Sequence, residues 1–379
     1  MLTRPMLARF RKKLLRWFAE FQRDLPWRRT KNTYHIWLSE IMLQQTRVAA
    51  AIPYYERFLA AFPEVKVLAQ APEEEVLRHW AGLGYYSRAR NLQKAARQIV
   101  AEHDAAFPDT SEKALALSGI GAYTAAAILS IAYGRKLAVL DGNVARVIAR
   151  LAGIRGDLRS GGRWQLLQKS ADELLSPQAP GDWNQAMMEL GATICTPRSP
   201  QCLLCPVAEF CEARKLGLAD VIPENRKLRD VVEVMLAALV IVDPEGRTLL
   251  LPHGKSRAMT GHDVAVLLSR MWHFPTIQVK KDARKELRDF AASCIGKRFA
   301  AEFQGLPKVR HAVTYRQITV LPFRAEVEKL PVIAYAKTLR LDDLSLVPVS
   351  NLTRKVAGAA LCAVVDWKTA REKAPTLCF

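Results

Sequence analysis

The chain has 379 residues, of which 50% are apolar and 25% are charged, which suits a globular protein with one large core or two to three domains. No run approaches the ~18 uninterrupted apolar residues that a membrane span needs. Lysine and arginine number 56 against 37 aspartates and glutamates, a formal net charge of +19. This excess indicates a polyanionic partner, nucleic acid first, and a merely basic surface is the alternative.

The N-terminal part has a helical pattern as far as about Arg214, interrupted by short breaks. Its basic start, Met1 to Arg16, resembles a mitochondrial presequence in charge only. It lacks serine, and its apolar positions keep helical spacing through Phe21. The pattern therefore predicts a first domain helix and an all-α region.

Within this region a Gly-x-Gly turn, Gly119-Ile120-Gly121, opens a helix of small residues. Glycines permit tight turns, and the free amides at a helix start can hold a phosphate without reading a base. A tight helix–helix connection is the alternative. Farther along, Asp141 precedes another helix, where it can act as an ordinary N-cap.

Four cysteines follow as C-x6-C-x2-C-x5-C: Cys195, Cys202, Cys205 and Cys211. Such a compact group of thiolates is typical of a metal site, and both zinc and a four-iron cluster accept four sulfur ligands. The spacing does not decide between them. Disulfides are disfavoured because nothing marks the chain as secreted.

The character changes after Leu216. A charged segment leads into a β-branched run, residues 231–242, closed by a turn and followed by a second short run at 248–251, which is typical of a hairpin. Further apolar segments and a helical pattern at 283–294 indicate a smaller α/β domain. The predicted organisation is an all-α domain over residues 1–214, a linker over 215–230 and an α/β domain over 231–379.

Several motifs follow one another along the chain in a characteristic order. They are Leu25-Pro26-Trp27-Arg28, the segment from Trp37 to Thr46, Gly82-Leu83-Gly84-Tyr85-Tyr86, the glycine hairpin, Leu140 to Val144, and the four cysteines. In this order they resemble the helix-hairpin-helix DNA glycosylases, and more narrowly the A/G-mismatch adenine DNA glycosylases of the MutY family. The resemblance implies a [4Fe-4S] cluster on the four cysteines. It also implies hydrolytic removal of adenine opposite 8-oxoguanine or guanine in duplex DNA.

Two carboxylates suit that chemistry. Cleaving a purine N-glycosidic bond requires a proton for the leaving base and stabilisation of a positively charged sugar. Glu40 lies among apolar helix neighbours, so burial is expected to raise its pKa and keep a proton available. Asp141 is expected to be more solvated and to stay ionised. The resemblance assigns the same roles, with Glu40 as acid and then water activator and Asp141 as electrostatic partner or transient nucleophile.

Two further residues complete the expected catalytic set. Relatives that cleave the strand carry a lysine that forms a Schiff base with the sugar, and by the family register that position is Tyr123 here. A phenol cannot form an imine, so a monofunctional glycosylase is expected. Asn143 is expected to orient the water or Asp141, and a plain helix-surface role is its alternative.

The resemblance also implies a set of DNA contacts, because the target base must leave the stack before its bond is reached. The expected contacts are Trp27, Arg28, Gln44, Gln45, Thr46, Leu83, Tyr85, Gly119, Gly121, Glu189, Thr314 and Tyr315. Gln44 to Thr46 would enter the minor groove, Leu83 and Tyr85 would intercalate, and Glu189 would meet an adenine edge. The alternatives are that Trp27 and Tyr85 are core aromatics and that Glu189 is a solvated helix residue.

The second domain resembles the Nudix-like C-terminal domain of the same family, which reads 8-oxoguanine. Family members carry His-x-Phe-Ser-His in its recognition loop, whereas this chain has His311-Ala312-Val313-Thr314-Tyr315. Double-stranded DNA is the expected partner, a monomer the expected state, and the bacterial cytoplasm, in association with the nucleoid, the expected location. The alternatives are an endonuclease III-type glycosylase-lyase and a non-catalytic, redox-sensing iron-sulfur DNA-binding protein.

Overall fold

The structure is a computed structural model that describes residues 3–224, 230–252, 271–295, 299, 301–313, 315–333 and 335–369. The chain forms two compact units. One comprises Met1–Ala71 and Ser87–Lys227, and the other comprises Pro72–Tyr86 and Leu228–Phe379. No helix in the described ranges is both long enough and apolar enough to cross a membrane.

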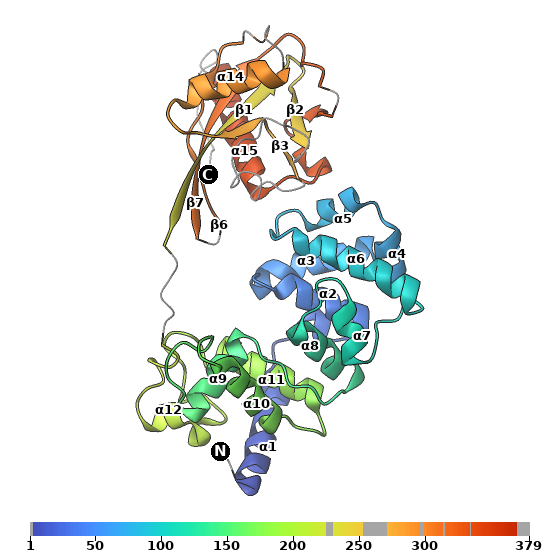
Figure 1. Cartoon of the computed structure of the whole chain (residues 1–379), viewed down its shortest axis with the longest axis vertical. Coiled ribbons are helices and arrows are strands. Elements are labelled where there is room, and N and C mark those ends of the chain that lie inside the picture. The colour runs from blue at the N-terminus through green and yellow to red at the C-terminus, as the bar shows by residue number, and fades with distance from the viewer. Residues whose placement is uncertain are drawn as a thin grey trace. The chain divides into compact units, whose positions relative to one another are not determined.

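The first unit is entirely helical in its described residues, as expected. Its helices are α1 (Arg4–Phe21), α2 (Thr33–Leu43), α3 (Val48–Ala61), α4 (Val65–Gln70), α6 (Ser87–Glu102), α7 (Ser111–Ala116), α8 (Ala122–Tyr133), α9 (Gly142–Ala152), α10 (Arg163–Leu174), α11 (Pro180–Thr193) and α12 (Glu212–Lys215), with 3-10 turns η1 (Pro26–Arg28) and η2 (Ala208–Phe210). Helix α1 buries Phe10, Leu14 and Phe18, the stripe that its periodicity predicts. In Figure 1 this N-terminal helix lies beside α11 from the later part of the unit, against which it packs.

Helices α2 and α8 pack together at the centre of this unit and differ from the others in composition. Both are apolar on nearly every side, which is the pattern of a helix surrounded by protein. Close packing continues at Gly181 of α11, where an added Cβ would lie 2.7 Å from the Ser130 carbonyl oxygen of α8. A polar side chain on α2 is therefore held in a dry and rigid setting.

The second unit contains α5 (Glu73–Trp80) and a mixed sheet flanked by two helices (Figure 1). The strands are β1 (Val232–Val242), β2 (Arg247–Pro252), β3 (Trp272–His273), β4 (Thr276–Gln278), β5 (Gln304–Gly305), β6 (Val309–Val313), β7 (Arg316–Glu326) and β8 (Lys337–Arg340). The predicted hairpin is present, because β1 and β2 pair antiparallel with Val242 opposite Thr248. The long β1–β7 pair is parallel and runs the full length of both strands.

Alternation along β1 explains the layers of this unit. Leu236, Ala238 and Val240 join one core cluster, which includes Val356 of α15 (Asn351–Thr369). The intervening residues Ala237, Leu239 and Ile241 join another, which includes Leu287 of α14 (Ala283–Ile295). A strand with a helix on each face must be apolar at every position, as β1 is from Val234 to Val242. The expected α/β fold of this part, with the mixed sheet of a Nudix-like domain, is confirmed.

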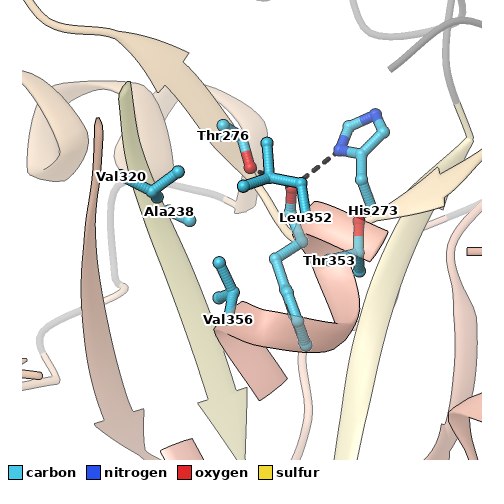
Figure 2. Close-up of a pocket in the computed structure, with 8 residues that line it drawn as sticks. Ala238, His273, Thr276, Val320, Leu352, Thr353 and Val356 are labelled. Atoms are coloured by element: carbon cyan, nitrogen blue, oxygen red, sulfur yellow. Dashed lines mark hydrogen bonds between the residues drawn. The ribbon is translucent and has the colours of Figure 1, made fainter. Parts of the chain in front are cut away.

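One cavity in the sheet unit lies under its β3–β4 corner (Figure 2). His273 Nδ1 lies 2.7 Å from the Phe274 carbonyl oxygen, and the Thr276 hydroxyl donates to the same oxygen at 2.7 Å. Leu352, Thr353 and Val356 of α15 form the opposite wall. The cavity measures about 10 Å³, the space of roughly one water, so it cannot admit a nucleobase.

Candidate active site and cluster module

Glu40 is in the last turn of α2 and is only 7% exposed, among Ile36, Trp37 and Ile41. Burial is the largest cause of a pKa of about 7 for its carboxyl. The hydrogen bond from Tyr123 and the charge of Arg28 lower this pKa, whereas the Asp141 carboxylate raises it. The raised pKa expected from the sequence is thus present, and a protonated fraction remains at neutral pH.

Tyr123, near the start of α8, points its hydroxyl at this carboxyl. The phenol Oη lies 2.9 Å from Oε2 of Glu40 and 3.2 Å from the sulfur of Met188. Burial, and then the two carboxylates, raise the pKa of the phenol well above its usual value, so it stays protonated and donates. The family's lysine position therefore holds a hydrogen-bond donor in this chain.

Asp141 is the N-cap of α9, where its Oδ1 accepts from the Val144 amide at 2.7 Å. The capping role expected as the alternative is therefore real, but it uses one oxygen only. Oδ2 accepts from Asn143 Nδ2 at 3.2 Å. Burial raises the pKa of Asp141, opposed by the Val144 and Asn143 hydrogen bonds, so this carboxylate is less solvated than we expected but remains more exposed than Glu40.

Asn143 connects this carboxylate to the cysteine module. Its Oδ1 accepts from Arg146 NH2 at 2.9 Å, and Arg146 Nε donates to the Cys195 carbonyl oxygen at 2.9 Å. Arg146 also donates to the Gly191 carbonyl at 2.7 Å. Asn143 is therefore positioned by its partners and not a free surface amide.

The four cysteines line one cavity together with Arg150. Among the described residues, no three His, Cys, Asp or Glu side chains are close enough to share a single metal ion. Four thiols around one cavity are a donor set that fits an iron–sulfur cluster. Arg150 is buried, and its NH1 lies 3.3 Å from the Cys195 sulfur and 2.7 Å from the Thr196 carbonyl oxygen. Hydrogen bonds of this kind tune and orient cluster ligands.

Glu189 of α11 is buried and paired with two arginines, and is not the solvated helix residue that was the alternative. The carboxylate is 1% exposed and accepts four hydrogen bonds. Arg23 supplies three, from its backbone amide at 3.2 Å, Nε at 2.7 Å and NH2 at 2.7 Å, and Arg28 NH2 supplies the fourth at 2.9 Å. A carboxylate has about four lone-pair sites, so all are in use. Although burial opposes it, the two arginines lower the pKa of Glu189 to about 2.

Trp27 and Arg28 are adjacent in η1 but have different environments. Trp27 is 8% exposed, and its ring packs edge-on against Tyr55 with centroids 5.3 Å apart, as a core aromatic does. Arg28 bridges Glu189 and the surroundings of Glu40, because its charge affects the pKa of both. Of the two residues, Arg28 is the one whose charge acts on the Glu40 carboxyl.

The predicted hairpin joins α7 to α8 through Gly119 and Gly121. Gly119 has a φ of +78°, and a Cβ there would lie 2.7 Å from Cβ of Asn91, so only glycine fits. Gly121 is the N-cap of α8, with no side-chain cap and no atom within 4 Å of an added Cβ. The start of α8 is thus open toward an anion.

Gln44, Gln45 and Thr46 follow α2 directly. Gln44 Nε2 lies 3.4 Å from the Thr124 hydroxyl, whereas Gln45 is exposed and has a left-handed φ of +61°. Arg88 donates to the Gln44 carbonyl oxygen of this segment and to the Ile41 and Met42 carbonyl oxygens just before it, in α2. The sequence did not single out Arg23, Arg88, Arg146 or Arg150. A single charged residue in an otherwise apolar helix face, as at Arg146 and Arg150, is the signal that identifies two of these arginines.

The remaining expected contacts belong to the second unit. Tyr85 is 42% exposed with a φ of +48°, whereas Leu83 is 9% exposed. Tyr315 lies in the tight turn between β6 and β7, with the Arg316 guanidinium 4.6 Å from its ring centroid and its carbonyl accepting from the Val232 amide. Thr314 lies outside the described residues.

Two family models match this chain. Residues 38–172 match the HhH-GPD superfamily base excision DNA repair protein, and residues 195–211 match the iron-sulfur binding domain of endonuclease III. The second match begins at the first cysteine and ends at the last. The chain therefore has the [4Fe-4S] cluster that the resemblance implies, and the four cysteines are its proposed ligands.

The helical part is similar to a solved structure of a thermostable thymine-DNA glycosylase, with a TM-score of 0.50 and 28% identity over 55% of this chain and 97% of that one. Among curated proteins, the adenine DNA glycosylase of Schizosaccharomyces pombe is 33% identical over 332 residues, which cover 74% of this chain and 72% of that protein. The adenine DNA glycosylase of Homo sapiens is 48% identical over 215 residues, 54% of this chain. The chain spans only 39%, 42% and 41% of the length of the human, rat and mouse relatives.

Proposed function

Because the chain belongs to the adenine DNA glycosylase family, we propose that it hydrolyses the N-glycosidic bond of adenine mispaired with 8-oxoguanine or guanine in duplex DNA. The observation that carries this proposal is the pair of carboxyls, Glu40 and Asp141, with different environments. Glu40 is buried, with a pKa of about 7, whereas Asp141 is more exposed and stabilised by two hydrogen bonds. Different environments of this kind divide the roles of acid and counter-charge.

In the proposed reaction Glu40 first gives a proton and later accepts one, whereas Asp141 acts through its charge. Protonated Glu40 donates its proton to a ring nitrogen of the flipped adenine, and the C1′–N bond breaks with its electron pair moving to the base. The Asp141 carboxylate stabilises the positive charge on the sugar. Glu40, now ionised, removes a proton from water, and the oxygen of that water adds to C1′. The products are free adenine and an abasic site.

The same geometry supports a monofunctional enzyme. Tyr123 donates to Glu40 and has no amine with which to attack the sugar. Asn143 holds Asp141, and Arg28 lies beside the acid. Glu189 acts in this proposal chiefly by fixing Arg28, with an adenine contact only if one of its four hydrogen bonds is exchanged.

DNA contacts are proposed for both units. Gln44 to Thr46 and the amides after Gly121 would contact the duplex around the site, and Leu83 with Tyr85 would enter the stack. We assign catalysis to residues 1–214, a linker to 215–230 and lesion reading by Thr314 and Tyr315 to residues 231–379. The proposed active state is a monomer on mismatched nucleoid DNA in the bacterial cytoplasm.

The [4Fe-4S] cluster would be held by Cys195, Cys202, Cys205 and Cys211. When bound, the cluster would cross-link the seventeen residues from Cys195 to Cys211 and so stiffen the segment that follows α11. Arg146 and Arg150 tie this segment to α9, the helix that Asp141 caps.

The proposal is tested by single-turnover excision on four duplexes that place adenine opposite 8-oxoguanine, guanine, cytosine or thymine. Products are analysed with and without alkali. We expect excision opposite 8-oxoguanine and guanine, with strand breaks only after alkali. Strand cleavage without alkali would support the endonuclease III-type alternative. Tight DNA binding without any excision would support the non-catalytic alternative.

A further inference from the structure

We propose that Arg88 is a positioning residue for base excision, which holds the C-terminal end of helix α2 and the Gln44–Thr46 segment in their active geometry. The inference rests on the proposed function and assigns a role to a residue that does not itself contact the reacting atoms. Arg88 is the second residue of α6.

The end of α2 needs external hydrogen-bond donors. The last carbonyls of a helix have no partners within it, and glycine in a left-handed conformation commonly supplies the missing cap. Helix α2 has no such glycine, because its C-cap is Gln44 with φ −58° and ψ 111°. The following left-handed residue is Gln45, which has a side chain.

Arg88 supplies those donors. Its NH1 donates to the carbonyl oxygens of Ile41 at 2.9 Å and Met42 at 3.1 Å, and also to that of Gln44. Its NH2 lies 3.4 Å from the Thr46 hydroxyl. One planar guanidinium thus forms hydrogen bonds with groups just before and just after the end of the helix. Its positive charge also lies at the negative end of the helix dipole.

The groups that Arg88 holds are the ones that matter for excision. Ile41 directly follows the buried acid Glu40, so fraying of this last turn would move the carboxyl relative to Tyr123. Gln45 has a φ of +61°, a costly conformation for a residue with a side chain, which persists only where neighbouring contacts enforce it. Arg88 therefore fixes both the acid and the exposed Gln45.

The test compares Arg88→Met with Arg97→Met. Arg97 is a matched control because it lies on the same helix and its Nε donates to a carbonyl at another helix end, that of Ala69, at 3.0 Å. Both variants lose one positive charge and keep an aliphatic stem. The measurements are the single-turnover excision rate per active enzyme, affinity for a duplex with a non-hydrolysable 2′-fluoro adenosine, thermal unfolding, and hydrogen exchange of residues 41–46.

We expect Arg88→Met to lower the excision rate constant by about 10- to 100-fold, since small displacements of a catalytic group are costly. Affinity for the duplex should change no more than in Arg97→Met, and exchange at 41–46 should become faster only in the Arg88 variant. Arg88→Lys should fall between, because an ammonium keeps the charge but not the planar fork. If Arg88→Met does not fold, Arg88→Lys is compared with Arg97→Lys by the same measurements.

Equal rate constants for Arg88→Met and Arg97→Met, or weaker affinity with an unchanged rate constant, would overturn the inference. So would unchanged exchange at residues 41–46. A wild-type protein that excises adenine from none of the four duplexes would instead reject the proposed function, and the exchange measurement would still test the role of Arg88 in holding the helix end.

Discussion

The phenol oxygen of Tyr123 lies 2.9 Å from Oε2 of Glu40, which joins residues that are 83 positions apart in the sequence. The hydrogen bond favours the ionised carboxylate and so lowers the pKa of Glu40 against the larger, opposite effect of burial. The balance leaves a pKa of about 7, where one carboxyl can give a proton and later accept one.

Replacing this acid should stop the reaction without preventing binding. Glu40→Gln keeps the shape of the side chain but cannot supply a proton, so excision should fall by more than the ~10²- to 10⁴-fold typical of a single acid–base step. Single-turnover excision and duplex affinity are measured together. Glu20→Gln, which removes an exposed glutamate of α1, is the control. Substantial turnover by Glu40→Gln would remove Glu40 from the catalytic role.

The excision rate should decline as pH rises through about 7, because the acid form of Glu40 is lost there. Tyr123→Phe removes a hydrogen bond that lowers this pKa, so the pKa should rise further and the decline should move to higher pH. The measurement is the single-turnover rate constant from about pH 5.5 to 9 for both proteins. A decline that stays in place or moves to lower pH would contradict this account of the pair.

The helix-capping role of Asp141 can be tested separately from the role of its charge in excision. Asn caps helices as well as Asp, so Asp141→Asn should keep the cap on Val144 but lose nearly all excision. Asp141→Ala should lose both, with an additional cost of about 0.5–2 kcal/mol in the free energy of unfolding. Thermal unfolding and single-turnover excision distinguish the two effects. Near wild-type excision by a folded Asp141→Asn would leave only the capping role.

The abasic product should stay intact until alkali is added. Borohydride, which reduces an imine between a lysine and the sugar, should trap no covalent complex with the wild-type protein. Tyr123→Lys places an amine at that position and should yield a trapped complex with weak strand cleavage. Efficient trapping by the wild-type protein, dependent on another lysine, would show that the enzyme is bifunctional.

Preference for 8-oxoguanine over guanine should depend on the β6–β7 turn. Thr314→Ala combined with Tyr315→Ala removes one or two hydrogen bonds at ~0.5–1.5 kcal/mol each, which should narrow the preference about three- to a hundredfold. The ratio of excision rates opposite 8-oxoguanine and guanine is compared in the two proteins. An unchanged ratio would direct attention to Gln45, Thr46 and Tyr85.

Sequence reasoning was strongest where chemistry depends on local pattern. The cysteine spacing predicted a metal module, the apolar neighbours of Glu40 predicted its raised pKa, and a β-branched run closed by a turn predicted the β1–β2 hairpin. These features depend on residues close together along the chain, where helical and strand periodicity decide what is buried.

Contacts between distant segments were decided only in the tertiary structure. Periodicity shows that a residue is buried but not which remote side chain meets it. The pairing of Glu189 with Arg23 and Arg28, and the parallel partner of β1, were therefore not identifiable from the sequence. The sequence by itself determined which groups carry the chemistry. The packing of α2 against α8 decided the Glu40–Tyr123 pair, because only burial in a shared core makes a proton on Glu40 available at neutral pH.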